Sequence, residues 1–393
     1  MSTWLLPESV ADVLPIEARR IEDLRRVLLD CFRTYGYEFV IPPLLEYTDS
    51  LLGQADQSLD LQTFKLLDQQ SGRLLGIRSD TTPQVARIDA HLLNRQGPAR
   101  LCYCGPTLQT KARGLHSTRE PLQCGAELYG CSGLEADLEV ISLATQVLQL
   151  ANISGFRLAL SHAGLVKAIL ADKNVSPIWM RLIHQALAQK DSQQLAEVSQ
   201  HLSKPFQEQL AGILNLYGFA GGSDCVLARA RKEFSTLASV RLILDQLQQV
   251  IDHIRLMSPD LEIMVDLADL ASFNYHSGLI FSAYCDRCPN PILRGGRYDN
   301  VGQIYGRSRP ATGFSVDLRE LVSLSNNALT PTSAIRAPWG SDQQLVAKIV
   351  ELRQQGETVV QVLSHSFLEQ DEFICDREIK QDSTGHWVVV SLR

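Results

Sequence analysis

The chain has 393 residues, of which 45% are hydrophobic and 21% charged, and its formal net charge is −7. This length and composition are typical of a soluble globular protein with two or three domains, each able to bury a core. The negative net charge argues against a nucleic-acid-binding protein, because such binding needs a basic surface.

The N-terminus and the cysteines indicate the compartment. The first fifteen residues contain Glu8 and Asp12 and lack a basic region, so they do not resemble a signal peptide, and no apolar run is long enough to span a membrane. The nine cysteines show no disulfide rhythm, which predicts a reducing, cytoplasmic location. A single Cys-x-x-Cys, Cys285 to Cys288, is weak support for zinc, and we expect neither a metal nor a cofactor.

In chain order, the first predicted element is a helix over residues 16–35, whose apolar side chains share one face and which stops at Gly36. A strand follows and breaks at Pro42-Pro43, and the runs on either side of residues 69–72 predict a hairpin. The next helix is expected to begin at Thr82, with that threonine as its cap.

Two long extended segments, residues 100–110 and 119–130, predict antiparallel strands, and a helix over 135–151 closes this block. Residues 163–256 are rich in Leu, Gln and Ala and predict a helical insertion. Strands return at residues 261–268 and 278–285.

These elements predict an α+β fold, an antiparallel sheet flanked by helices, because strands often follow strands. We assign residues 1–322 to this domain, with the helical insertion at about 163–256. Residues 323–341 are predicted to be a linker. Residues 342–393 predict a small α/β C-terminal region.

One strand carries a candidate binding face. Alternate residues of a strand share a face, so Gln123, Gly125 and Glu127 point the same way, with an amide and a carboxylate on either side of an open position. Such a face suits a small polar ligand with an amine or imidazole. The alternative is a solvated strand face with a chance glycine.

Three other segments carry candidate polar residues. Asp80 and Thr82 precede a helix, so either residue could simply cap it. Tyr275 and His276 could be ordinary packed residues. Arg297 and Asp299 follow two glycines and could pair, and that stretch is neither a Walker loop nor a Rossmann fingerprint.

Five stretches in a fixed order resemble the catalytic domain of histidyl-tRNA synthetases, a class II family, over roughly residues 5–322. The stretches are YGYEFVIPPLLEYTDSLL, IRSDTTPQVAR, YCGPTLQTKARGLHSTREPLQCGAELYG, NYHSGLIFSAY and GGRYDNVGQIYGRSRPATGFSVDLREL. The resemblance implies a class II synthetase-like antiparallel sheet flanked by helices, dimerisation through the first motif and a helical insertion. It also implies a histidine site made by Asp80, Thr82, Gln123, Glu127, Tyr275 and, in place of a second tyrosine, His276.

The sequence departs from this family where ATP is bound. Gln109, Ala271 and Glu320 stand where the resemblance implies arginines. Arginines stabilise the charge that develops on phosphate in the transition state, and losing one such donor typically costs about 3 kcal/mol. Glu320 would also repel a phosphate, and Arg319 beside it points elsewhere on a helix. The pattern predicts a site that holds histidine without activating it, and hence no catalytic residues.

A synthetase body without these arginines resembles the family of ATP phosphoribosyltransferase regulatory subunits, in the first step of histidine biosynthesis. That resemblance implies a separate short catalytic subunit, a hetero-octamer and feedback inhibition by histidine. The acidic charge and the lack of a membrane-spanning apolar run predict no nucleic-acid or membrane partner. One alternative is a diverged histidyl-tRNA synthetase. Another is a free-standing RNA-binding or sensor protein, and the acidic charge disfavours its RNA-binding form.

Overall fold

The structure is a computed structural model that describes residues 4–52, 57–112, 114, 117–170, 175–270, 276–326, 332–363 and 373–392. The chain forms two compact units. The larger comprises Met1–Asp12 with Ile21–Asn326, and the smaller comprises Val13–Arg20 with Asn327–Arg393.

A nine-stranded sheet organises the larger unit, in the order β1-β5-β6-β12-β11-β10-β7-β9-β8. β1 pairs in parallel with β5, and β7 pairs in parallel with β9, whereas the central pairs from β5 to β7 are antiparallel. The strands of this sheet are β1 (Glu38–Phe39), β5 (Ala99–Pro106), β6 (Leu122–Tyr129), β7 (Arg157–His162), β8 (Tyr217–Phe219), β9 (Glu262–Asp266), β10 (Leu279–Cys285), β11 (Cys288–Arg297) and β12 (Ala311–Asp317). This confirms the predicted α+β class, with a sheet that is mixed where the sequence predicted an antiparallel one, because two of its outer pairs are parallel.

Helices surround this sheet. Those of the larger unit are α1 (Pro15–Thr34) from Ile21 onward, α2 (Thr48–Leu52), α3 (Gln57–Gln62), α4 (Thr82–Arg87), the π-helical η1 (Ile88–Leu93), α5 (Leu134–Leu150), α6 (Leu165–Ile169), α7 (Pro177–Ala188), α8 (Ser192–Ser199), α9 (Lys204–Ile213), α10 (Val226–Glu233), α11 (Ala238–Met257), the 3-10 helix η2 (Val301–Tyr305) and α12 (Leu318–Leu324). Helices α6–α11 fall in the segment predicted as a helical insertion, with β8 as its one strand in the described residues. In the described part of the chain, no helix combines the length and the apolar character that crossing a bilayer requires.

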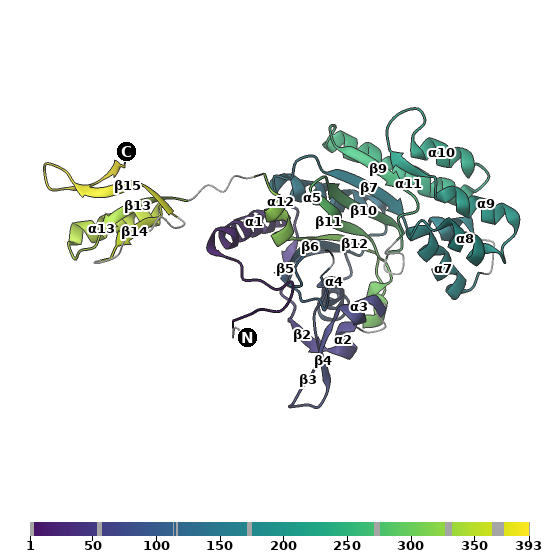
Figure 1. The fold of residues 1–393 in the computed structure, drawn as a ribbon, viewed down its shortest axis with the longest axis horizontal. Coiled ribbons are helices and arrows are strands. Elements are labelled where there is room, and N and C mark those ends of the chain that lie inside the picture. Colours follow the sequence, from purple (N-terminus) through teal and green to yellow (C-terminus); the bar gives the residue numbers. More distant parts are fainter. Residues whose placement is uncertain are drawn as a thin grey trace. The chain divides into compact units, whose positions relative to one another are not determined.

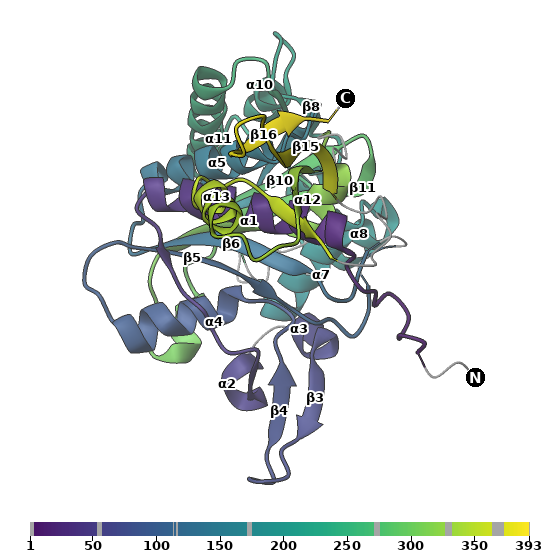
Figure 2. The same ribbon diagram turned by 90° about the vertical axis from the view of Figure 1, so that its left-hand side faces the viewer.

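The two faces of the sheet have different surroundings. Helices α1 and α5 lie over one face and α4 lies over the other, as both views show (Figures 1 and 2). On the first face, the Phe32 ring of α1 meets the Phe314 ring of β12 edge-on at 6.1 Å. Since neighbouring residues of a strand point to opposite faces, Gly313 and Ser315 belong to the α4 face.

The hairpin predicted around residues 69–72 is present in a three-stranded sheet of β2 (Leu45–Tyr47), β4 (Leu74–Ile77) and β3 (Phe64–Leu67). The predicted cap of the next helix is wrong by one residue. Thr81 occupies the N-cap position of α4 without a side-chain cap, and the Thr82 N–H donates to Asp80 Oδ1 at 3.0 Å. The Asp80 carboxylate therefore takes over the capping contact.

Among its described residues from Thr332 on, the smaller unit has a four-stranded sheet, β14-β13-β15-β16, and the helix α13 (Gln343–Gln354). Its strands are β13 (Thr332–Pro338), β14 (Val359–Val362), β15 (Phe373–Gln381) and β16 (Trp387–Ser391). The predicted linker over 323–341 therefore includes a strand. β13 lies in parallel between β14 and β15, both later in the chain, and its Ser, Thr and Pro residues conceal this pairing in the sequence.

Candidate functional site

The candidate site lies on the α4 face of the sheet, where Glu127 of β6, Gly313 of β12 and Gly296 of β11 pair side by side. A Cβ at Gly313 would lie 1.7 Å from Glu127 Oε2, so the Glu127 side chain crosses β12 only because residue 313 is glycine. A Cβ at Gly296 would lie 2.6 Å from Cδ2 of His276. The two glycines thus separate a carboxylate from an imidazole along one row of the sheet.

Two tyrosines hold the Glu127 carboxylate, whose residue is only 1% exposed. The Tyr103 hydroxyl donates to Oε1 at 3.1 Å, and the Tyr298 hydroxyl donates to Oε2. Burial raises the pKa of Glu127 to about 8, with Asp80 adding to the rise and the tyrosine hydrogen bonds opposing it. A carboxyl group with this pKa carries its proton near neutral pH, and a ligand cation would favour its ionised form.

We predict that this carboxyl makes folding stability depend on pH. Its pKa is raised in the folded chain from an ordinary value of 4.5. The free energy of unfolding should therefore fall as the pH rises between about 4.5 and 8, because only the unfolded chain gives up the proton.

Glu127→Gln, which keeps the shape and cannot ionise, should lack this contribution. Its stability relative to the unchanged chain should rise by a few kcal/mol from about pH 5 to pH 8. Urea denaturation at several pH values measures the difference. A constant difference across that range would contradict the burial assigned to Glu127.

The predicted polar residues at the start of α4 meet those of β6. Gln123 donates from Nε2 to Asp80 Oδ1 at 2.8 Å, and its Oε1 accepts from the Thr81 N–H at 2.8 Å. The Thr82 and Tyr103 hydroxyls lie 3.1 Å apart, which links this network to Glu127. The structure thus brings Asp80, Thr82, Gln123 and Glu127 together, and their role in binding histidine stays a prediction.

Of the two remaining candidate histidine-binding residues, the structure describes only His276. Tyr275 lies outside the described residues, as does Ala271. His276 lies against Gly296 of β11, one strand beyond Gly313. Their roles also stay predictions.

Sequence reasoning missed the two tyrosines that contact Glu127. Tyr103 lies directly opposite Gly125, whose Cβ would be 2.5 Å from its hydroxyl, so strand alternation could have indicated it. Tyr298 belongs to the Gly-Gly-Arg-Tyr-Asp stretch and directly follows the end of β11. No pattern in the sequence signals that its hydroxyl reaches β6.

The residues that replace the implied ATP arginines are engaged within the protein. Gln109 is 1% exposed and donates from Nε2 to the Ser79 carbonyl at 3.3 Å. Glu320 accepts from the Cys288 thiol at 3.2 Å. The Arg319 guanidinium donates to the Glu120 carbonyl at 3.1 Å and to the Ala11 carbonyl at 3.3 Å. These backbone contacts engage it outside the candidate site.

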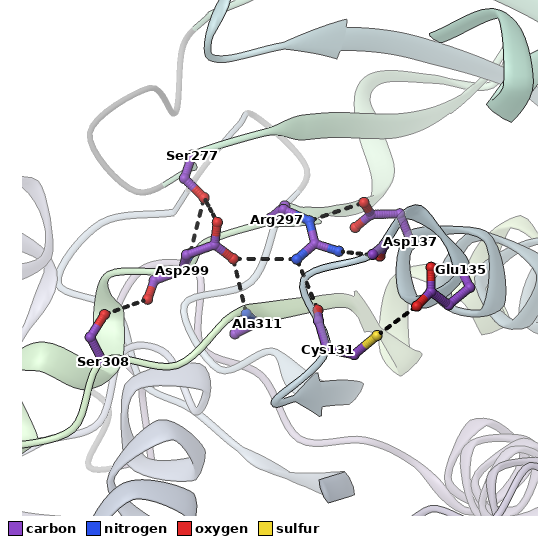
Figure 3. A network of polar contacts seen from close by, with 9 residues as sticks. Cys131, Glu135, Asp137, Ser277, Arg297, Asp299, Ser308 and Ala311 are labelled. Carbon is purple, nitrogen blue, oxygen red and sulfur yellow. Dashed lines mark hydrogen bonds and ion pairs between the residues drawn. The ribbon is translucent and has the colours of Figure 1, made fainter. Parts of the chain in front are cut away.

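Behind the site, Arg297 anchors the end of β11 on the opposite face (Figure 3). Its Nε donates to Asp137 Oδ2 of α5 at 3.0 Å, and Nη1 also lies 3.4 Å from Asp299 Oδ1, as the sequence suggested. Asp299 accepts from the Ser277 hydroxyl at 2.9 Å. This network fixes the backbone next to His276 and Tyr298.

A cavity of about 210 Å³ lies on this helix-covered face, beside Asp137, His162 and Arg297. None of the candidate histidine-binding residues lines it. Burial lowers the pKa of His162 to about 4, so its imidazole is neutral near pH 7. The cavity is distinct from the candidate site.

Comparisons with known proteins identify the family of the chain. Residues 9–321 match the family model described as Histidyl-tRNA synthetase, and residues 332–390 match the one described as ATP phosphoribosyltransferase subunit HisZ C-terminal domain. The structure of histidyl-tRNA synthetase from Nostoc sp. superimposes with a TM-score of 0.76 at 19% identity, covering 100% of this chain and 97% of that one, which concerns the fold alone. The fold and the match over residues 9–321 define a class II histidyl-tRNA synthetase-like chain.

Relatives with higher sequence identity show which family within this class the chain belongs to. A solved structure from Bacillus halodurans, an ATP phosphoribosyltransferase regulatory subunit/histidyl-tRNA synthetase, has a TM-score of 0.78 and 27% identity, covering 94% of this chain and 96% of that one. The ATP phosphoribosyltransferase regulatory subunits of Burkholderia cenocepacia and Burkholderia multivorans are 52% and 51% identical over 389 residues, 99% of each chain. The chain belongs to the family of ATP phosphoribosyltransferase regulatory subunits, which favours that interpretation over a diverged synthetase.

Proposed function

We propose that the chain binds free histidine on the α4 face and passes that signal to a separate, short catalytic subunit of ATP phosphoribosyltransferase. In this proposal it does not catalyse the reaction itself. Two copies associate through the first motif, and the whole assembly is a hetero-octamer. A cytoplasmic location fits the nine cysteines, all of which are free.

One contrast supports the proposal above all. The Glu127 carboxyl, held by two tyrosines, suits the imidazole, and the Asp80 carboxylate suits the ammonium group. Gln109 and Glu320, by contrast, supply no positive charge where ATP would need it. Such a site can bind the amino acid but cannot stabilise the negative charge that develops on a reacting triphosphate.

Regulation also needs two states of the assembly. Histidine can shift their balance only if it binds one of them more tightly. A coupling of about 1–3 kcal/mol between the two sites corresponds to about a 5- to 150-fold effect. That range is large enough for feedback control.

The test is to mix the purified chain with a short catalytic subunit and to measure phosphoribosyl-ATP formation with and without histidine. We expect the chain to raise the activity and histidine to lower it within the 5- to 150-fold range. In parallel, the chain alone should show no histidine-dependent exchange of pyrophosphate into ATP. Exchange activity would instead favour a diverged synthetase, and a chain without effect on the catalytic subunit would contradict the regulatory role.

A further inference from the structure

Arg294 of β11 stands on the same face of the sheet as Glu127. It pairs with Ser315 of β12, which in turn pairs with Gly125 of β6. Directly opposite residues in an antiparallel sheet share a face, so Arg294 belongs to the row next to that of Glu127, about 7 Å along the strands. One strand, β12, lies between them, so two inter-strand spacings, or about 10 Å, separate its backbone from that of Gly125.

The Arg294 side chain is exposed, and no hydrogen bond or ion pair joins its guanidinium to another residue in the described ranges. Arg297, three positions along the same strand, differs in both respects. It points to the opposite face and is 8% exposed, and its guanidinium contacts Asp137, Asp299 and two carbonyl groups. In the described residues Arg294 therefore makes no hydrogen bond or ion pair that would explain it, although its charge opposes the raised pKa of Tyr284 on the neighbouring β10.

A site for an amino acid needs a positively charged group to bind the α-carboxylate of the ligand. An amino acid presents an α-carboxylate as well as an ammonium group, and neither Glu127 nor Asp80 can supply a positive charge to match that carboxylate. Arg78, which lies close to Gly105 of β5, is committed to the carbonyls of Pro106 and Pro42. The Arg294 fork matches a carboxylate with two parallel hydrogen bonds.

We propose that Arg294 binds the α-carboxylate of the amino-acid ligand and makes the site select histidine over its decarboxylated analogue. This inference rests on the proposed histidine site. It assigns the positive charge to β11, on the same face of the sheet as Glu127. The imidazole of the ligand then lies over Gly313 against Glu127.

The experiment compares histidine with histamine, which lacks the carboxylate, by calorimetric titration of the full-length chain. We expect Arg294→Ala to weaken histidine binding about 10- to 100-fold, as for a lost charge-assisted hydrogen bond, and to change histamine binding less than about twofold. Arg294→Lys should recover part of the loss, because it keeps the charge without the fork. Arg33→Ala, an exposed arginine of α1 on the other face, is the matched control and should leave both ligands unaffected.

The outcomes separate this inference from the histidine site itself. If the unchanged chain does not bind histidine, or if Glu127→Ala binds it normally, the proposed site is wrong. If histidine binding depends on Glu127 while Arg294→Ala affects both ligands equally or neither, only the role of Arg294 is overturned. Equal melting temperatures of the variants exclude unfolding as the cause.

Discussion

Arg297→Met is expected to lower the free energy of unfolding of the larger unit by about 3–5 kcal/mol. The Arg297 and Asp137 side chains are only 9% and 5% exposed. Burial raises the pKa of Asp137, and the Arg297 charge opposes that rise. Without the guanidinium, the buried carboxylate would lose its counter-charge, and the carbonyls of Cys131 and Gly133 would lose their donor.

Urea denaturation followed by circular dichroism measures this effect, and the double variant Arg297→Met with Asp137→Leu is its control. Replacing both members of a buried ion pair with apolar residues is often close to neutral, so the double variant should recover most of the lost stability. A single variant within about 0.5 kcal/mol of the unchanged chain would show that this pair does not stabilise the fold.

Glu127→Ala is expected to weaken histidine binding by about 2–5 kcal/mol, or at least about 30-fold. The substitution removes a buried acceptor that Tyr103 and Tyr298 hold in one orientation. The imidazole N–H would then meet a space without a partner, which is the costly case for a polar group leaving water. Titration calorimetry measures the affinity, and the histidine inhibition curve of the assembled enzyme should shift by the same factor.

Glu320→Gln provides the matched control, because it removes a carboxylate of α12 that contacts Cys288 instead of the candidate site. We expect it to leave histidine affinity unchanged. If histidine inhibits the assembly containing Glu127→Ala as strongly as the unchanged assembly, histidine must bind elsewhere, for example between subunits.

The sequence predicted most elements of the larger unit because its apolar residues repeat with clear helical or strand periods. It placed Gln123, Gly125 and Glu127 on one face, since alternation along a strand is a local property. It failed at β13, where strand pairing depends on segments later in the chain. It also placed the α4 cap on Thr82, whereas the helix begins one residue earlier with Thr81 as N-cap, and the Thr82 N–H donates to Asp80.

By itself, the sequence determined the order of the five motifs, the α+β class and the loss of the implied ATP arginines, because these depend only on which residue stands at which position. Only the tertiary structure decided that Tyr103 and Tyr298 converge on Glu127, that Gly313 makes room for its side chain and that Arg294 shares its face. Those facts depend on the register of four strands from distant parts of the chain. The raised pKa of Glu127 has the same origin, since burial is a property of packing and not of any one segment.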